Sequence, residues 1–394
     1  MKITAIEVLG QKLKTAFIRV KTDGGITGIG ATSAPPPVIE AIINSGPDSL
    51  RHFIEGEDPT HLNDLWRKMS QQWLARRGRG GEGGLAVNAM AAVDLALWDI
   101  WGKTHNMPIY RLLGGSLQDE IMAYASSQAL DLQSNLGDKI IKLKPTDILV
   151  QEAKERVKEG FKAIKFGWGD NFQLEDEAAM AAIREIVGPD IRLMLDFGCP
   201  VYHQPGMTVK DAVKRAKMME RYDYFFFEEA LHPYNVEGFR ALTKQVNIKI
   251  ATGESLTTVD EFKPFIFTHA VDIIQPDAQQ MGFTQFLRVT RMAEDANILC
   301  VPHGPWTPIL IAAHLNALAT TRNGIMIEYP SPDVFPSDSG RSKYLKLLFE
   351  KGFEKPLKLR NGFLQLPDSP GLGLGDYNSE VFKELNNLGE GWHA

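Results

Sequence analysis

Three short stretches decide the fold: IRLMLDFG at 191–198, YFFFEEA at 224–230 and IKIATGES at 248–255. Each is an apolar, β-prone run that reaches an acidic residue, and these residues are Asp196, Glu228 and Glu254. Their spacing is on the order of 25–30 residues, the length of one strand–helix unit. In a (β/α)8 barrel the carboxyl ends of the strands converge on one rim, so the three carboxylates are expected to meet there.

An all-oxygen ligand set suits Mg²⁺ rather than Zn²⁺, which prefers His and Cys. Taken singly, each of the three acidic residues is equally well explained as an ordinary polar residue at the end of a strand. Taken together, and with the strand ends described below, they favour a site for one Mg²⁺ ion in each subunit.

Composition excludes several classes of protein. The chain has 394 residues, more than one typical domain, and its net charge of −6 comes from charges of both signs mixed throughout. It has no long Lys/Arg block, so we expect no nucleic-acid partner. Its two cysteines, Cys199 and Cys300, form no CxxC motif, which excludes a zinc knuckle and predicts a cytoplasmic protein. The start MKITAIEVLG does not resemble a secretory signal, and no apolar run approaches about 18 residues, so no membrane partner is expected.

The first part of the chain predicts a small α+β domain over residues 1–117. The runs ITAIEVLG, AFIRVKT and ITGIGAT indicate a three-stranded meander, with Asp23-Gly24-Gly25 as one of its turns. Two helices are predicted next, over 36–55 and in VNAMAAVDLALWDIWGKTH at 87–105. The second helix is apolar on nearly all sides, so we expect it to be buried between domains.

The segment RRGRGGEGG at 76–84 separates these two helices. Five glycines in a short span do not pack as a regular element, so the segment is predicted to be a loop. It is either a solvated linker or a lid over an anionic substrate. In the second case Arg76 and Arg79 would clamp a distal carboxylate of a diacid.

From about Ile121 the pattern changes to strands that alternate with amphipathic helices. Eight strand candidates follow, namely IMAYASS, FKAIKFG, IRLMLDF, YFFFEEA, IKIATGE, VDIIQPD, NILCVPH and GIMIEYP. They predict an α/β fold in which a (β/α)8-type, modified TIM barrel covers residues 118–356. A doubly wound open sheet is the alternative. The tail at 357–394 contains GLGLG, but no βαβ unit follows it, so it is predicted to pack back on the N-terminal domain and complete it.

Polar residues also end the other predicted strands: Lys165 the second, Asp277 the sixth, His303 the seventh and Glu328 the eighth. Strands six and seven are neighbours, so Asp277 is placed to accept a hydrogen bond from one ring nitrogen of His303. The other ring nitrogen of His303 would then act as a general base. Alone, a His beside Pro is more often a loop or core residue, and Lys165 could be a surface lysine. Together they predict removal of the α-proton of a carboxylate, with Lys165 and a protonated Glu328 stabilising the enediolate.

With these motifs the chain resembles the enolase superfamily and, within it, the mandelate racemase subgroup, over essentially its full length. The resemblance rests on the N-terminal domain with its Gly-rich loop, LMLDF, FFEEA, ATGES, IIQPD, VPHG, Glu328 and the GLGLG tail. It implies Asp196, Glu228 and Glu254 as Mg²⁺ ligands and the His303–Asp277 pair as a base. It also implies that Glu328 contacts the substrate carboxylate, that the N-terminal capping domain selects the substrate, and that the chain forms homo-oligomers.

Three positions depart from the subgroup pattern. The second strand reads Lys165-Phe166-Gly167 where Lys-x-Lys is usual, the third reads Asp196-Phe197-Gly198 where Asp-x-Asn is usual, and Ala230 replaces a proline. Gly167 removes the second acid–base group. Racemisation requires two such groups on opposite faces of the substrate, whereas one His can complete a syn elimination.

We therefore predict a sugar-acid dehydratase, a carbon–oxygen lyase that converts an aldonate or aldarate to a 2-keto-3-deoxy acid. The alternatives are a racemase, epimerase or cycloisomerase of the same superfamily, and a silent protein that only binds ligands. A second base would restore the first alternative, and the candidates for it are Lys165, Lys162, Tyr124 and His203. Tyr124, Trp168 and His203 are also candidate substrate-binding residues.

Overall fold

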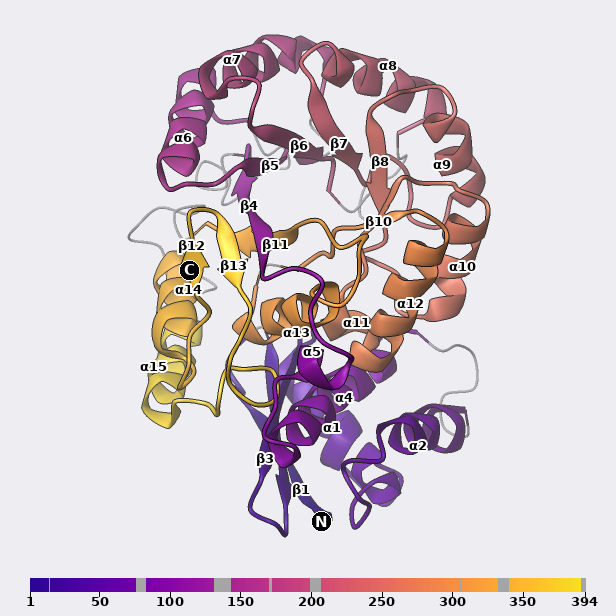
Figure 1. Cartoon of the computed structure of the whole chain (residues 1–394), viewed down its shortest axis with the longest axis vertical. Coiled ribbons are helices and arrows are strands. Elements are labelled where there is room, and N and C mark those ends of the chain that lie inside the picture. Colours follow the sequence, from indigo (N-terminus) through magenta and orange to yellow (C-terminus); the bar gives the residue numbers. More distant parts are fainter. Residues whose placement is uncertain are drawn as a thin grey trace.

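The computed structural model describes residues 1–13, 15–75, 83–130, 143–169, 172–198, 207–304, 306–331 and 340–390. The N-terminal part is a three-stranded antiparallel sheet covered by helices (Figure 1). Its strands are β1 (Ile3–Leu9), β2 (Ala16–Thr22) and β3 (Thr27–Thr32). Its helical segments are α1 (Pro36–Asn44), η1 (Leu50–Phe53), α2 (Leu62–Arg67), η2 (Lys68–Leu74), α4 (Leu85–Thr104) and α5 (Ile109–Leu112). The predicted meander is confirmed.

Helix α4 joins the N-terminal sheet to the rest of the protein. By length and composition it could cross a membrane, but 83% of its apolar window is buried inside the protein, as predicted. Asp94 on this helix accepts hydrogen bonds from the backbone and hydroxyl of Thr284. Asp99 accepts from the backbone N–H groups of Ile29 and Leu372. The helix is therefore fixed to the sheet, the barrel and the tail by buried carboxylates.

Strand β3 lies against α4 at van der Waals distance because two of its residues are glycines. A Cβ atom on Gly30 would lie 1.9 Å from the carbonyl oxygen of Ala92, and one on Gly28 would lie 2.0 Å from that of Ala96. Backbone atoms cannot move aside as a flexible side chain can. The sequence GIG in β3 is thus a packing requirement.

Gly30→Ala is expected to lower the free energy of unfolding by about 3 kcal/mol, because the sheet and α4 must separate to admit the methyl group. Urea unfolding followed by circular dichroism measures this loss. Gly24→Ala is the matched control, since its Cβ would meet side-chain atoms of Met1, the nearest at 3.1 Å, and the Thr22 hydroxyl at 3.8 Å, but no backbone atom within 3.8 Å. Equal stability of the two variants would contradict the close approach of β3 and α4.

Eight parallel strands form the second part, in the order in which they occur along the chain. They are β4 (Glu120–Gln128), β5 (Ala163–Gly167), β6 (Arg192–Asp196), β7 (Tyr224–Glu228), β8 (Lys249–Thr252), β9 (Ile273–Ile274), β10 (Leu299–Cys300) and β11 (Ile327–Pro330). The last strand, β11, pairs with the first, β4. An isolated β-bridge between Cys300 and Gly324 connects β10 to the segment just before β11. The sheet is therefore closed, which excludes the doubly wound alternative.

Helices follow the strands and surround the barrel (Figure 1). They are α6 (Thr146–Lys158), α7 (Glu177–Val187) preceded by η4 (Leu174–Asp176), α8 (Val209–Glu220), α9 (Val236–Thr243), α10 (Val259–Phe267), α11 (Ala278–Met281), α12 (Phe283–Asp295), α13 (Pro308–Leu318) and α14 (Gly340–Lys351). In α8, the predicted face of Ala212, Val213, Ala216 and Met219 packs on the strands.

The inside of the barrel is built in layers. One apolar layer takes a residue from each of the eight strands or from the position next to it, namely Tyr124, Ala163, Met194, Phe226, Ala251, Ile273, Val301 and Met326. Side chains alternate along a strand, so residues two positions further on point to the same interior. Those residues are Ser126, Lys165, Asp196, Glu228, Gly253, Gln275, His303 and Glu328. A polar layer therefore rests on an apolar floor.

Two segments differ from the predictions. The helix expected over 36–55 is broken after Asn44, because Gly46 has a φ of 80° and Pro47 follows it. The tail is also more regular than predicted. It forms a hairpin of β12 (Leu359–Arg360) and β13 (Phe363–Gln365), which pairs with β4, and a helix, α15 (Ser379–Glu390).

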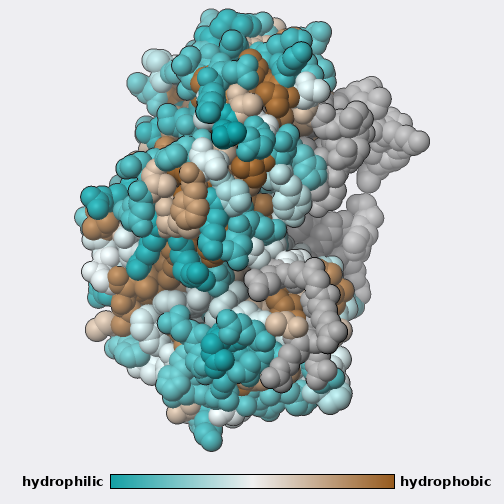
Figure 2. Space-filling view, turned by 90° about the vertical axis from the view of Figure 1, so that its right-hand side faces the viewer, coloured by the Kyte–Doolittle hydropathy of each residue, from teal (hydrophilic) through white to brown (hydrophobic). Residues whose placement is uncertain are grey.

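The tail contacts the N-terminal sheet as well as the barrel. The Tyr377 hydroxyl donates to the carbonyl oxygens of Ile18 and Gly30, at 2.9 and 2.8 Å. Gly371, in the GLGLG stretch, places its backbone so close to Asp99 that a Cβ atom would lie 2.1 Å from the carboxylate. The glycines there serve packing. Figure 2 shows a largely hydrophilic face, on which hydrophobic residues form separate patches.

Candidate active site

The structure brings the three predicted metal ligands together at the carboxyl ends of neighbouring strands. Asp196 ends β6, Glu228 ends β7, and Glu254 lies two residues beyond β8. One carboxylate oxygen from each residue lies within 4.8 Å of the others. Three hard oxygen donors at this separation fit a divalent cation such as Mg²⁺.

Burial and the neighbouring negative charges raise the pKa of two of these carboxylates, Glu228 and Glu254. Burial, together with the nearby Asp196, raises the pKa of Glu228 to about 8. The pKa of Glu254 is also raised, chiefly by burial. Buried carboxylates are stable as anions only when cations compensate them. The cluster therefore has the charge as well as the geometry of a cation site.

Lys165 supplies part of the compensating charge. Its side chain is 3% exposed, and its Nζ lies 2.9 Å from Glu228, 3.0 Å from Glu328 and 3.5 Å from Asp196. Burial alone lowers the pKa of this lysine, but the carboxylates of Glu228 and Glu328 outweigh burial and raise it well above its usual range. Lys165 is thus a fixed positive charge at the centre of the polar layer, and the alternative of a surface lysine is excluded.

Glu328 lies on the other side of Lys165. Its carboxylate accepts hydrogen bonds from the Ser126 hydroxyl at 2.7 Å and from the Gly304 backbone N–H at 2.9 Å. Burial raises the pKa of Glu328, but Lys165 and His303 lower it to about 2 overall. Its neighbours in this structure are cations and hydrogen-bond donors that stabilise the anion, so they do not support the prediction of a protonated Glu328.

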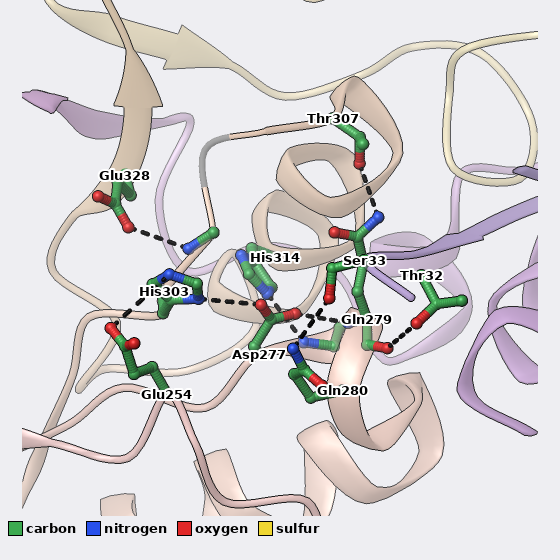
Figure 3. Close-up of polar contacts among 12 residues, drawn as sticks. Thr32, Ser33, Glu254, Asp277, Gln279, Gln280, His303, Thr307, His314 and Glu328 are labelled. Carbon is green, nitrogen blue, oxygen red and sulfur yellow. Dashed lines mark hydrogen bonds and ion pairs between the residues drawn. The ribbon is translucent and has the colours of Figure 1, made fainter. Parts of the chain in front are cut away.

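His303 and Asp277 form the predicted pair (Figure 3). The Nδ1 atom of His303 lies 3.0 Å from Oδ2 of Asp277, and its Nε2 atom faces Glu254 at 3.7 Å. Burial lowers the pKa of His303, but Glu254 and the hydrogen bond to Asp277 raise it well above its usual range. One ring nitrogen is thus held by Asp277, while the other points towards the metal ligands.

The short helix α11 holds Asp277 in place (Figure 3). Asp277 caps this helix by accepting from the Gln279 N–H at 2.7 Å. The Gln279 side chain donates to the Thr307 hydroxyl at 3.0 Å, and the backbone carbonyl of Gln279 accepts from the Thr32 hydroxyl at 3.0 Å. His314 accepts from the N–H of Ala278 at 3.2 Å. The capping domain, through Thr32, therefore shares a hydrogen-bond network with the predicted base.

Gln279→Ala is expected to lower kcat about 10-fold with little change in KM, because the loss of the bond to Thr307 loosens the helix that Asp277 caps. Steady-state kinetics on the accepted substrate measures the separation of kcat from KM. The exposed Gln245, whose side chain bonds only to the Ala241 carbonyl, provides the control Gln245→Ala. An unchanged kcat for Gln279→Ala would contradict this positioning role.

The remaining predicted residues are placed as follows. Tyr124 lies in the apolar floor, with its ring 5.6 Å from Lys165 Nζ. Trp168 is fully buried on the outer side of the barrel wall, and its indole N–H donates to Asp176 at 2.9 Å, which argues against a contact with the substrate. Lys162 is exposed before the start of β5, at the end opposite Lys165. Arg76, Arg79 and His203 lie outside the described residues.

Sequence reasoning missed four contributors to the polar layer and its rim. They are Ser126, the backbone N–H of Gly304, Gln275 and Gln128. Gln275 is fully buried, and neither amide atom has a hydrogen-bond partner among the described residues. The sequence IMAYASSQ could have identified two of these four contributors. Tyr124, Ser126 and Gln128 recur with the period of two that places residues on one face of a strand.

Comparison with known proteins agrees with this architecture. Residues 4–114 match the N-terminal domain of the mandelate racemase / muconate lactonizing enzyme family, and residues 149–375 match the enolase C-terminal domain-like family. A D-galactonate dehydratase from Xanthomonas euvesicatoria is 30% identical over 83% of this chain and 81% of its own length. A D-galactonate dehydratase from Ralstonia pickettii is 28% identical over 100% of this chain and 96% of its own.

Among solved structures, the 3,6-anhydro-D-galactonate cycloisomerase from Zobellia galactanivorans is similar, with a TM-score of 0.79 and 28% identity. The match covers 98% of this chain and 99% of that chain. The prediction of an enzyme of the hydro-lyase class agrees with the two curated relatives. Two family models match this chain, and a relative is 30% identical over most of its length. The chain therefore belongs to the mandelate racemase / muconate lactonizing enzyme family of the enolase superfamily.

Proposed function

We propose that this protein is a Mg²⁺-dependent dehydratase that converts a sugar acid into a 2-keto-3-deoxy acid. The observation that carries the proposal is the direction of His303, whose free Nε2 points at the carboxylate cluster while Asp277 holds Nδ1. A substrate carboxylate held beside that cluster would place its α-carbon within reach of the imidazole. The two relatives named as D-galactonate dehydratases support the sugar acid as substrate.

In the proposed reaction neutral His303 accepts the α-proton at Nε2. Glu254 and Asp277 raise the pKa of this imidazole when no cation is bound, and a cation held by Glu254 would oppose that effect. The electron pair of the broken C–H bond moves into the substrate carboxylate, which becomes an enediolate. Asp277 stabilises the imidazolium that forms, because its carboxylate already accepts the bond from Nδ1. Mg²⁺ held by Asp196, Glu228 and Glu254 would neutralise the charge that develops on the substrate carboxylate.

Lys165 is a buried positive charge beside Glu228, and it would stabilise the same developing negative charge on the substrate. The enediolate then expels the β-hydroxyl, and the proton on His303 joins it as water. The bond between the α- and β-carbons becomes double, and the enol tautomerises to the 2-keto acid. A single histidine completes both proton transfers on one face of the substrate, as the glycine at position 167 requires.

A panel of mono- and diacid sugars tests this proposal. D-Galactonate is the first acid to assay, because both curated relatives are named for it. Semicarbazide reveals a 2-keto acid, and the expected result is Mg²⁺-dependent formation of this product from at least one sugar acid. If no acid on the panel gives a 2-keto product with Mg²⁺ present, the proposal fails.

Cycloisomerisation is the second candidate, and the likeness to the Zobellia galactanivorans enzyme is the observation that favours it. Mass spectrometry separates the two, because dehydration removes one water from the substrate and isomerisation leaves its mass unchanged. A homo-oligomer and a cytoplasmic location also stay predictions, and size-exclusion chromatography with light scattering tests the first of them.

A further inference from the structure

The last residue of the first barrel strand, Gln128, lies beside the position where the sequence lacks a second acid–base group. Strands β4 and β5 run parallel, and their register pairs Gln128 with Gly167. Both residues continue the inward-facing series of their strands, Gln128 after Tyr124 and Ser126 and Gly167 after Lys165. They therefore share one place above the polar layer, on the side of the barrel formed by its first two strands.

The Gln128 carboxamide fills the space that a side chain at position 167 would occupy. A Cβ atom added to Gly167 would lie 2.6 Å from Oε1, 2.9 Å from Nε2 and 3.0 Å from Cδ of Gln128. All three distances are shorter than or at the limit of real Cβ contacts. A side chain at position 167 would have to displace this carboxamide, so in this conformation the space is filled from position 128.

The carboxamide is also free to bind a ligand. Gln128 is partly exposed, and its carboxamide makes no hydrogen bond within the described part of the chain. An amide donates through its nitrogen and accepts through its oxygen, but near neutral pH it neither gains nor loses a proton. It can therefore bind hydroxyl groups, which also donate and accept, without taking part in proton transfer.

We propose that Gln128 replaces the missing acid–base group with a neutral contact that binds a hydroxyl of the substrate and keeps proton transfer on the His303 side. This rests on the proposed function in one respect, because the hydroxyl belongs to the sugar acid. The residue thus determines specificity in two ways. It selects polyhydroxy acids over simple carboxylates, and it prevents reprotonation of the α-carbon from the opposite face.

Three variants test the proposal. Gln128→Ala removes the contact, and kcat/KM on the best sugar acid is expected to fall 10- to 100-fold, because the bound hydroxyl loses its partner. Gln128→Glu keeps the shape and adds an ionisable group. The double variant Gln128→Ala/Gly167→Lys moves a base into the vacated space. The exposed Gln151→Glu on α6 is the control for the added charge, and thermal unfolding with and without Mg²⁺ verifies an intact fold.

The decisive measurement is proton exchange at the α-carbon in D₂O, followed by NMR. The wild type is expected to incorporate deuterium with retention of configuration only. The double variant is expected to produce the deuterated epimer as well. Epimer formation by the wild type, or kcat/KM of Gln128→Ala and Gln128→Glu within twofold of wild type, would overturn the inference. A wild type that exchanges the α-proton without forming any 2-keto acid would instead refute the dehydratase, and its retention or inversion would still decide the role of Gln128.

Discussion

Replacing His303 with Asn is expected to reduce kcat by about 10⁴-fold and to abolish exchange of the substrate α-proton with D₂O. An asparagine can still donate a hydrogen bond to Asp277, but it has no group that accepts a proton near neutral pH. The distance of 3.0 Å between His303 Nδ1 and Asp277, and the direction of Nε2 towards Glu254, support His303 as the proposed base. Two assays measure the change, one of 2-keto acid formation and one of α-proton exchange by NMR.

The control is His105→Asn, at an exposed histidine that follows α4 and whose ring bonds to the Trp101 carbonyl and packs on the Trp101 ring. Mg²⁺ must still raise the Tm of His303→Asn, because the three metal ligands are unchanged. Exchange of the α-proton that persists in His303→Asn, with or without product, would assign proton abstraction to another group. Lys165, Tyr124 and His203 are the candidates for that group.

Much of this site could be predicted because the residues that form it end strands. In a parallel barrel, position along a strand determines height within the barrel, so residues such as Asp196, Glu228 and His303 meet although they are far apart in sequence. The apolar run before each residue identifies the strand, and the polar residue identifies its end. The same logic applied to β4 leads to Ser126 and Gln128, but these neutral side chains give no chemical signal of their own.

Other features depend on contacts between segments that no local pattern contains. The low pKa of Glu328 follows from Lys165, His303 and the Gly304 N–H, which converge only in the folded protein. The network that joins Thr32 to Asp277 through α11 crosses from one domain to the other. The hairpin in the tail, in contrast, could have been predicted from a local pattern. Asn361-Gly362 is a typical two-residue turn between two strands.

If the three carboxylates bind a metal ion, replacing one of them should change the stability of the protein differently with and without Mg²⁺. Buried acids that bind no metal would show no such difference. Glu254 is the residue of choice, because its nearest ionic partner is His303 at 3.7 Å and its charge is disfavoured by burial and by Asp196. Glu254→Gln should leave the metal-free protein as stable as wild type or more stable, since it removes one of several crowded carboxylates. It should also abolish the stabilisation that Mg²⁺ gives the wild type, which amounts to about 2.7 kcal/mol at 100 times the Kd.

Thermal unfolding in EDTA measures the stability of the metal-free protein, and unfolding in excess Mg²⁺ measures the stabilisation by the ion. Isothermal titration gives the affinity for Mg²⁺, which should fall at least 100-fold in Glu254→Gln. Activity should be lost in EDTA and return with Mg²⁺ in wild type but not in Glu254→Gln. The control Glu237→Gln, at an exposed residue of α9, should keep the wild-type response to Mg²⁺. If Glu254→Gln instead destabilises the metal-free protein and keeps the Mg²⁺ response, Glu254 is a structural residue. In that case Asp196 and Glu228 alone cannot account for a three-carboxylate site, and the proposed chemistry loses the cation that stabilises the enediolate.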